Sequence, residues 1–72
     1  RVASVLLRLN EKLSEESKEY ITMGRRDISN MVGTATESLN RTLADFKDEG
    51  LIEITFGGLK ILDRLTLEKL VR

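Results

Sequence analysis

Cysteine and histidine do not occur in this 72-residue chain, and its aromatic residues are Tyr20, Phe46 and Phe56. Without cysteine or histidine the chain cannot form disulfides or the usual zinc and iron–sulfur sites, and it lacks the most common acid–base catalyst. Three aromatic residues are too few for an RNA-binding sheet that stacks bases on aromatic rings. No nucleophile–base pair or phosphate-cradling loop is visible, so we expect neither an enzyme, nor a metal site, nor a resident cofactor.

Long apolar runs and an excess of charge are also missing. No run approaches the roughly 20 residues of a membrane span, and nothing resembles a signal peptide, so we expect a cytoplasmic protein without a membrane partner. Twelve basic residues balance 12 acidic ones. This balance counts against strong non-specific binding to polyanions, because lysine and arginine supply most of the affinity for phosphate. It leaves room for a local basic surface.

The beginning of the chain is abrupt. The sequence starts without methionine, and no N-cap residue precedes the apolar positions of its first helix. Helices normally begin with a cap that satisfies their free N–H groups. We therefore expect residues 1–72 to be a single small domain cut from a longer protein.

Apolar residues recur at helical spacing in four segments. Spacings of three and four residues predict helices over about residues 1–13, 25–32, 36–49 and 64–72. Gly33 and Gly50 are expected to end the second and third helices, because glycine readily takes the positive φ of a helix stop. Residues 14–19 read as a loop or a frayed helix, and residues 20–23 as a brief strand. In the last helix, Leu67, Leu70 and Val71 form the apolar side.

After Gly50 the apolar period changes from 3.6 to 2, which indicates strands. Ile52, Ile54 and Phe56 would share one face of the first strand. Gly57-Gly58 predicts a tight hairpin turn, because both glycines are able to take positive φ. The second strand would follow over residues 59–63. The order of elements predicts a mainly α fold with a small β-hairpin, namely a winged helix-turn-helix.

The third predicted helix has one apolar and one polar side. Leu39, Leu43 and Phe46 form the apolar side, and a rotation of about 100° per residue gathers the others opposite to it. That opposite side consists of Glu37, Asn40, Arg41, Ala44 and Asp48. Thr34 and Glu37 also have the spacing of a capping box, a role that would compete for the Glu37 carboxylate.

A helix-turn-helix places the start of its second helix against base edges in the major groove of DNA. Four residues on the exposed side of the first two turns are therefore candidate base readers: Thr36, Glu37, Asn40 and Arg41. Arginine can donate two hydrogen bonds to guanine, and glutamate can accept one from cytosine. The alternative is that Glu37 and Arg41 form an ordinary solvated pair one turn apart.

Two arginines open the second predicted helix, where the helix dipole disfavours cations. DNA phosphate is a candidate partner for Arg25 and Arg26, and a nearby carboxylate such as Asp27 or Glu16 is the alternative. Gly58 and Lys60 could bring the hairpin onto the DNA backbone. The alternative there is a plain turn with a solvated lysine.

Residues 25–54, "RRDISNMVGTATESLNRTLADFKDEGLIEI", and the following "GGLKILD" resemble the C-terminal DNA-binding domain of the Crp/Fnr transcription regulators. The resemblance covers nearly the whole chain. It implies an N-terminal β-roll sensor with an effector of its own, a homodimer, and a palindromic promoter site. Residues 10–20 correspond to a loop that contacts RNA polymerase in some relatives.

Individual positions follow the family pattern unevenly. By this resemblance Glu37 and Arg41 match the principal base readers, and Arg25 and Ser38 match phosphate contacts. Ser29 keeps the small size that the approach of the two helices requires. Four positions depart from the pattern. Gly24 and Ala35 stand where a serine or threonine usually caps a helix, and Thr42 stands where an aliphatic residue usually packs. Thr36 stands where the cyclic-AMP receptor type has a further base-reading arginine.

Two classes of function remain open from the sequence. One is sequence-specific DNA binding by a transcription regulator, which the placement of Glu37 and Arg41 favours. The other is a winged-helix module that binds another protein, which the neutral charge and the missing caps favour.

Overall fold

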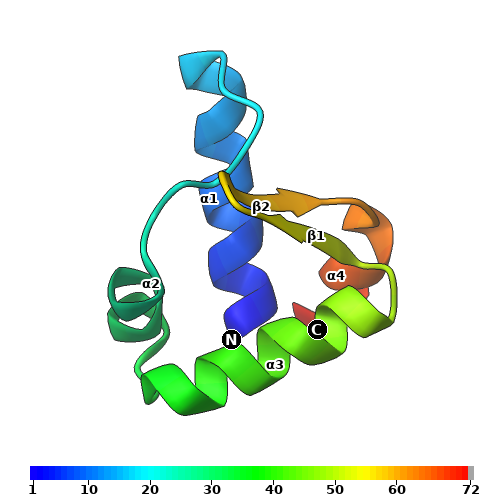
Figure 1. The fold of residues 1–72 in the computed structure, drawn as a ribbon. Coiled ribbons are helices and arrows are strands. Elements are labelled where there is room, and N and C mark those ends of the chain that lie inside the picture. The colour runs from blue at the N-terminus through cyan, green and yellow to red at the C-terminus, as the bar shows by residue number, and fades with distance from the viewer. Residues whose placement is uncertain (72) are drawn as a thin grey trace.

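The computed structural model describes residues 1–71. Four helices and one antiparallel hairpin follow one another along the chain (Figure 1). The predicted mainly α fold with a small hairpin, a winged helix-turn-helix, is confirmed. The elements are α1 (Val2–Glu16), α2 (Arg25–Val32), α3 (Thr36–Asp48), β1 (Ile52–Thr55), β2 (Gly58–Ile61) and α4 (Arg64–Val71).

Helix α1 lies at the centre of the domain. It passes behind the hairpin, with α2 on one side and α4 on the other, and its C-terminal end extends beyond the other elements (Figure 1). The helix continues to Glu16, three residues past the predicted end, because Ser14 to Glu16 contain no helix breaker. Ser17 ends it in the left-handed conformation, with φ of 56°, and the Lys18 amide donates to the Leu13 carbonyl at 2.9 Å.

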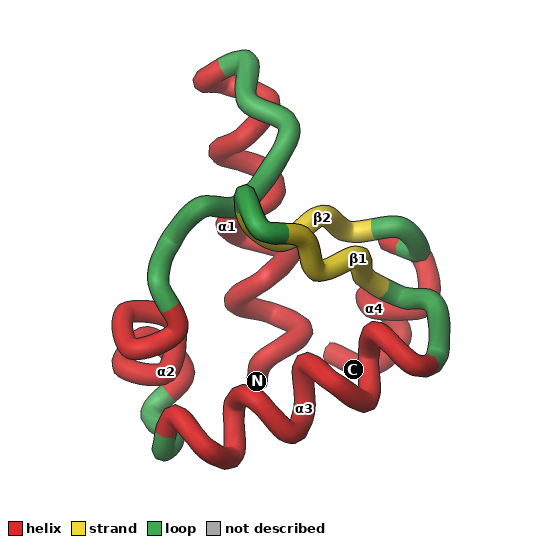
Figure 2. Tube along the Cα trace, viewed as in Figure 1, coloured by secondary structure: helices red, strands yellow, loops and turns green. Residues whose placement is uncertain are grey.

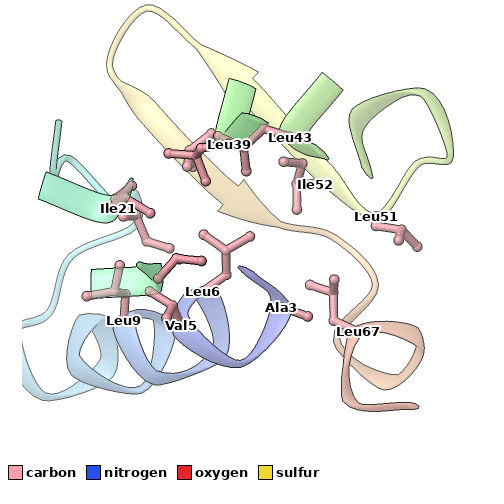
Figure 3. Close-up of a cluster of buried hydrophobic side chains, with 13 residues drawn as sticks. Ala3, Val5, Leu6, Leu9, Ile21, Leu39, Leu43, Leu51, Ile52 and Leu67 are labelled. Atoms are coloured by element: carbon pink, nitrogen blue, oxygen red, sulfur yellow. The ribbon is translucent and has the colours of Figure 1, made fainter. Parts of the chain in front are cut away.

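Every helix and strand contributes a side chain to one hydrophobic core (Figure 3). Leu39 and Leu43 of α3 and Ile52 of β1 are buried in this one core, so burial of apolar area holds α3 in its orientation. The large side chains that are almost completely buried are Leu6, Ile28, Leu39, Leu43, Ile52, Leu59 and Leu67.

The hairpin turn differs from the prediction by one residue. Ile52 pairs with Ile61 and Thr55 pairs with Gly58, so the turn consists of Phe56 and Gly57 (Figure 2). The Thr55 hydroxyl accepts a hydrogen bond from the Gly57 amide at 3.2 Å and donates one to the Gly58 carbonyl at 3.2 Å. Phe56 is fully exposed, at 110%, because it sits in the turn and not on the buried face of β1.

Gly58 takes a positive φ of 145°, whereas Gly57 does not. A third segment lies beside β2: Ile21 and Leu59 exchange two backbone hydrogen bonds, of 2.7 and 2.9 Å. A Cβ atom on Gly58 would collide with the Ile21 carbonyl oxygen. The brief strand predicted around residue 21 is therefore a single bridge residue, and it ties the loop before α2 to the hairpin.

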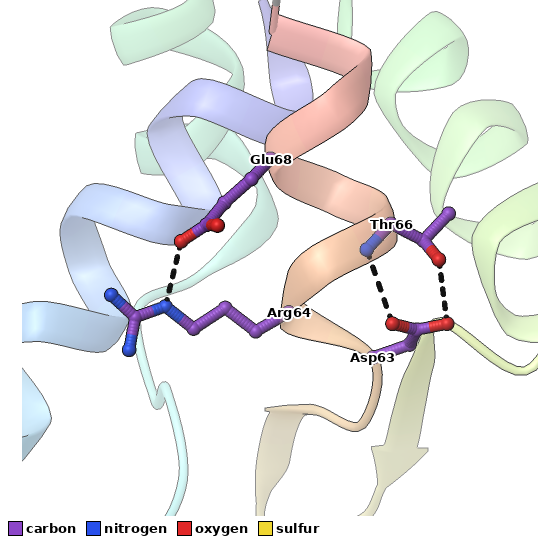
Figure 4. Close-up of polar contacts among 4 residues, drawn as sticks. All are labelled: Asp63, Arg64, Thr66 and Glu68. Atoms are coloured by element: carbon purple, nitrogen blue, oxygen red, sulfur yellow. Dashed lines mark hydrogen bonds and ion pairs between the residues drawn. The ribbon is translucent and has the colours of Figure 1, made fainter.

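Helix α4 is capped by Asp63, whose carboxylate accepts from the Thr66 hydroxyl at 2.7 Å and from the Thr66 amide at 3.1 Å (Figure 4). These hydrogen bonds favour the charged form and lower the pKa of Asp63 below its ordinary value of 3.8. Leu67 is buried, but Leu70 and Val71 stay 53% and 47% exposed, so the apolar side predicted for this helix is only partly used. Among residues 1–71, no helix has the length and apolar character to cross a bilayer.

Candidate nucleic-acid interface

Helix α3 has the two sides that its sequence predicts. Leu39 and Leu43 are buried in the core, and Phe46 packs partly buried against it. The polar side is exposed along its whole length, and its members are Glu37, Asn40, Arg41, Ala44 and Asp48. Because the core holds one side so firmly, the other side is presented to solvent in a fixed orientation.

The start of α3 leaves the Glu37 carboxylate free of a capping role. The N-cap residue is Ala35, so Thr34 lies outside the helix and cannot form the predicted capping box with Glu37. Within residues 1–71 the ion pairs are Lys18–Glu16, Lys60–Glu19 and Arg64–Glu68, and Glu37 and Arg41 are not paired with each other. Both side chains can therefore bind an external group without first breaking an internal contact.

The N-terminus of α2 presents two arginines. Arg25 is half-buried and Arg26 is exposed. Neither makes an ion pair within the described range 1–71, so the carboxylates of Asp27 and Glu16 do not hold them. The N-cap residue is Gly24, which has no side chain to bond the first-turn N–H groups. Two cations and several free N–H groups thus lie together at this helix end.

The corner between α2 and α3 is built around Ser29, which is only 3% exposed. Its carbonyl accepts hydrogen bonds from the Gly33 amide at 2.8 Å and the Thr34 amide at 3.0 Å, while Gly33 turns the chain with φ of 83°. Its hydroxyl donates to the Arg26 carbonyl at 2.8 Å and lies 3.3 Å from the Thr36 hydroxyl. The carbonyl and the hydroxyl of one buried residue therefore connect α2 to the turn and to the start of α3.

Two further contacts of this region have no signal in the sequence. The Arg1 guanidinium donates to the Val32 carbonyl at 2.8 Å, where it satisfies an acceptor at the end of α2. The Thr42 hydroxyl donates to the Ser38 carbonyl at 3.1 Å, so the unusual threonine inside α3 has a partner within its own helix. The Ser38 side chain, predicted to contact phosphate, is exposed.

The hairpin carries less free charge than its sequence suggests. The Lys60 ammonium lies 3.2 Å from the Glu19 carboxylate and 5.7 Å from the centre of the Tyr20 ring. The hydrogen bond and the charge of Glu19 raise the pKa of Lys60 above its ordinary value. Gly58 faces Ile21, so the residues at the tip itself are Phe56 and Gly57, both uncharged. In the described part of the chain no cluster of acidic side chains is placed to hold a metal ion.

Comparison with known proteins identifies the family to which this chain belongs. The sequence matches the family model of the Crp-like helix-turn-helix domain over residues 1–70. A search of curated proteins and a search of solved structures each found no match. The match confirms the resemblance seen in residues 25–54, and it identifies a DNA-binding domain of a transcription regulator. The chain belongs to the family of Crp-like helix-turn-helix domains.

Proposed function

We propose that this domain recognises a specific double-stranded DNA sequence by placing the first two turns of α3 in the major groove. The groove is about 12 Å wide and admits one helix. The observation that carries the proposal is the exposed polar side of α3, on which Glu37 and Arg41 lie one turn apart and are held by no internal partner among residues 1–71. Because they are exposed and have no ion-pair partner among residues 1–71, Glu37 and Arg41 can form hydrogen bonds with base edges.

The proposed base readers are Glu37, Asn40 and Arg41. Arginine donates two hydrogen bonds to guanine, asparagine pairs with adenine, and glutamate accepts from the cytosine amine. All three side chains are exposed on the same side of α3. Thr36 is also exposed at the start of the helix, but its hydroxyl already contacts Ser29.

The proposed phosphate contacts are Arg25, Arg26 and Ser38, helped by the free N–H groups at the start of α2. Phosphate would explain why two cations that form no ion pair among residues 1–71 occupy a helix end that disfavours positive charge. At the hairpin we propose that Gly58 and its neighbours contribute backbone groups. Lys60 contributes less than its charge suggests, because it already pairs with Glu19.

We further propose that two copies act together on a palindromic site in the cytoplasm. The chain has no net charge, so one domain offers few phosphate contacts. A second copy doubles each of these contacts. It also makes the site symmetric, because the two recognition helices then read half-sites about one helical turn of DNA apart.

One observation favours a second candidate function, which is binding to another protein. Phe56 stands fully exposed at an uncharged hairpin tip, and exposed aromatic side chains are common at protein interfaces. This second function would use the hairpin and would not require Glu37 and Arg41 on α3. Substitutions on α3 therefore separate the two candidates.

The test compares Arg41→Ala with Arg8→Ala, a matched control on the exposed surface of α1. Duplexes are selected from a library with a randomised centre, and affinity is measured by fluorescence anisotropy. We expect Arg41→Ala to weaken binding by roughly 1–3 kcal/mol and to relax the preference at one base pair. Arg8→Ala should bind as the wild type does. Equal binding by the wild type and Arg41→Ala contradicts the proposed function.

A further inference from the structure

We propose that Thr36 is a positioning residue that acts through Ser29, and that its hydroxyl does not donate a hydrogen bond to a base. The inference rests on the proposed function, because it concerns how the base-reading side of α3 is held against α2. Thr36 is the first residue of α3, directly before Glu37. Its position at the groove end of the helix makes a base contact the obvious alternative.

The direction of the hydrogen bonds follows from counting protons. The Ser29 hydroxyl has one proton, and its 2.8 Å contact with the Arg26 carbonyl uses it, because a carbonyl oxygen can only accept. The 3.3 Å contact between Ser29 and Thr36 must then be a bond that Thr36 donates. The result is a relay from the Thr36 hydroxyl through Ser29 to the Arg26 carbonyl. The proton that Thr36 could offer to a base is already engaged, so the hydroxyl could meet a base edge only as an acceptor.

The relay connects the two parts of the proposed DNA surface. Arg26, itself a proposed phosphate contact, lies in the first turn of α2, and Thr36 begins the helix that carries the base readers. Ser29, which lies between them, is only 3% exposed, so water does not compete for its hydroxyl. The N-cap residue Ala35 cannot anchor the start of α3 with a side chain. We infer that the relay supplies this anchor.

The experiment uses three single variants of the protein and one double variant, which combines Thr36→Val with Ser29→Ala. Thr36→Val removes the hydroxyl and keeps the shape, Thr36→Ser keeps the hydroxyl, and Ser29→Ala removes the acceptor. Affinity is measured for the duplex selected by the wild type and for every single base-pair variant of it. Circular dichroism at the assay temperature shows that each variant is folded.

We expect Thr36→Val and Ser29→Ala each to weaken binding by about fivefold, the effect of one hydrogen bond, and by the same factor on every duplex. The double variant should bind no more weakly than either single variant, because both remove the same contact. Thr36→Ser should restore nearly full affinity. A residue with a merely structural role would lower the unfolding midpoint and leave these affinities unchanged.

Three results would overturn the inference. One is a change in base preference at a single position with Thr36→Val but not with Ser29→Ala, which identifies a base reader. Another is additive loss in the double variant. The third is unchanged affinity of Thr36→Val, a variant that leaves the core intact because Thr36 is exposed. If instead Arg41→Ala binds as the wild type does, the proposed function itself has failed, and the inference fails with it.

Discussion

Gly58 is the residue whose identity the fold constrains most visibly. It combines a φ of 145° with a close approach to the Ile21 carbonyl, so any side chain there meets both backbone strain and a collision. The close approach goes with the pair of hydrogen bonds that Ile21 exchanges with Leu59, the residue after Gly58. A glycine in the hairpin thus holds the loop before α2 in place.

We expect Gly58→Ala to lower the free energy of unfolding by about 1–3 kcal/mol, because alanine tolerates neither the positive φ nor the contact. Urea unfolding followed by circular dichroism measures the change. Gly57→Ala is the matched control, since a Cβ there meets only the Thr55 hydroxyl oxygen, at 4.0 Å. Equal stability of the two variants would show that the bridge between Ile21 and Leu59 does not form.

At the scale of elements, α4 shows how a short helix is held at its start. Asp63 bonds both the amide and the hydroxyl of Thr66, and Leu67 inserts into the core one residue later. The Arg64–Glu68 pair one turn along the helix is exposed, where such pairs add little. The cap and one buried leucine therefore define where α4 begins.

The Asp63 cap makes part of the stability depend on pH. Its pKa is lowered by folding, so the charged carboxylate stabilises the folded state above pH 3.8, and this contribution is lost as the pH falls through the lower folded-state value. Asp63→Asn can still cap the helix but does not titrate. We expect the unfolding midpoint of the wild type to fall more steeply than that of Asp63→Asn below pH 3.8. Parallel curves would contradict this role.

The elements also show how far the sequence predicts the structure. Helix α3 was predicted well, because its period of 3.6 and the stop at Gly50 are local signals that tertiary contacts reinforce. The turn was misplaced by one residue: Gly58 pairs with Thr55 in the ladder and lies against Ile21, a contact between residues far apart in the sequence. The end of α1 was placed too early, since Ser14 to Glu16 are polar but fully compatible with a helix.

In the candidate interface, too, local features could be predicted, whereas contacts between residues far apart in the sequence could not. The exposure of Glu37, Asn40 and Arg41 was predicted from helical geometry, and it is confirmed. The partner of Lys60 could not be predicted, because Glu19 lies 41 residues before it. Nor could the relay through Ser29, which requires the angle between two helices and not their spacing in the sequence.

At the scale of the whole molecule, equal numbers of basic and acidic residues leave DNA affinity to a few well-placed cations. Lys60 is partly neutralised by Glu19, whereas Arg25 makes no ion pair within residues 1–71. Two cations of the same formal charge should therefore contribute differently to binding. This difference can be measured as salt dependence, because each neutralised phosphate releases counterions.

We expect Arg25→Gln to reduce the slope of log affinity against log salt concentration by about 1 for each bound domain. Lys60→Gln is the matched control and should change the slope by clearly less. The measurement is a salt titration of the wild type and both variants on the selected duplex. A larger effect of Lys60→Gln would mean that DNA displaces Glu19 and that the hairpin is the main phosphate contact.

Tyr20 gives this architecture a built-in optical reporter. It is the single tyrosine of a chain without tryptophan, and it sits beneath the Lys60 ammonium next to the bridge residue Ile21. Intrinsic ultraviolet fluorescence of the unlabelled domain therefore comes almost entirely from Tyr20, where the loop before α2 contacts the hairpin. If heating or nucleic-acid binding separates this loop from the hairpin, we expect the fluorescence of Tyr20 to change.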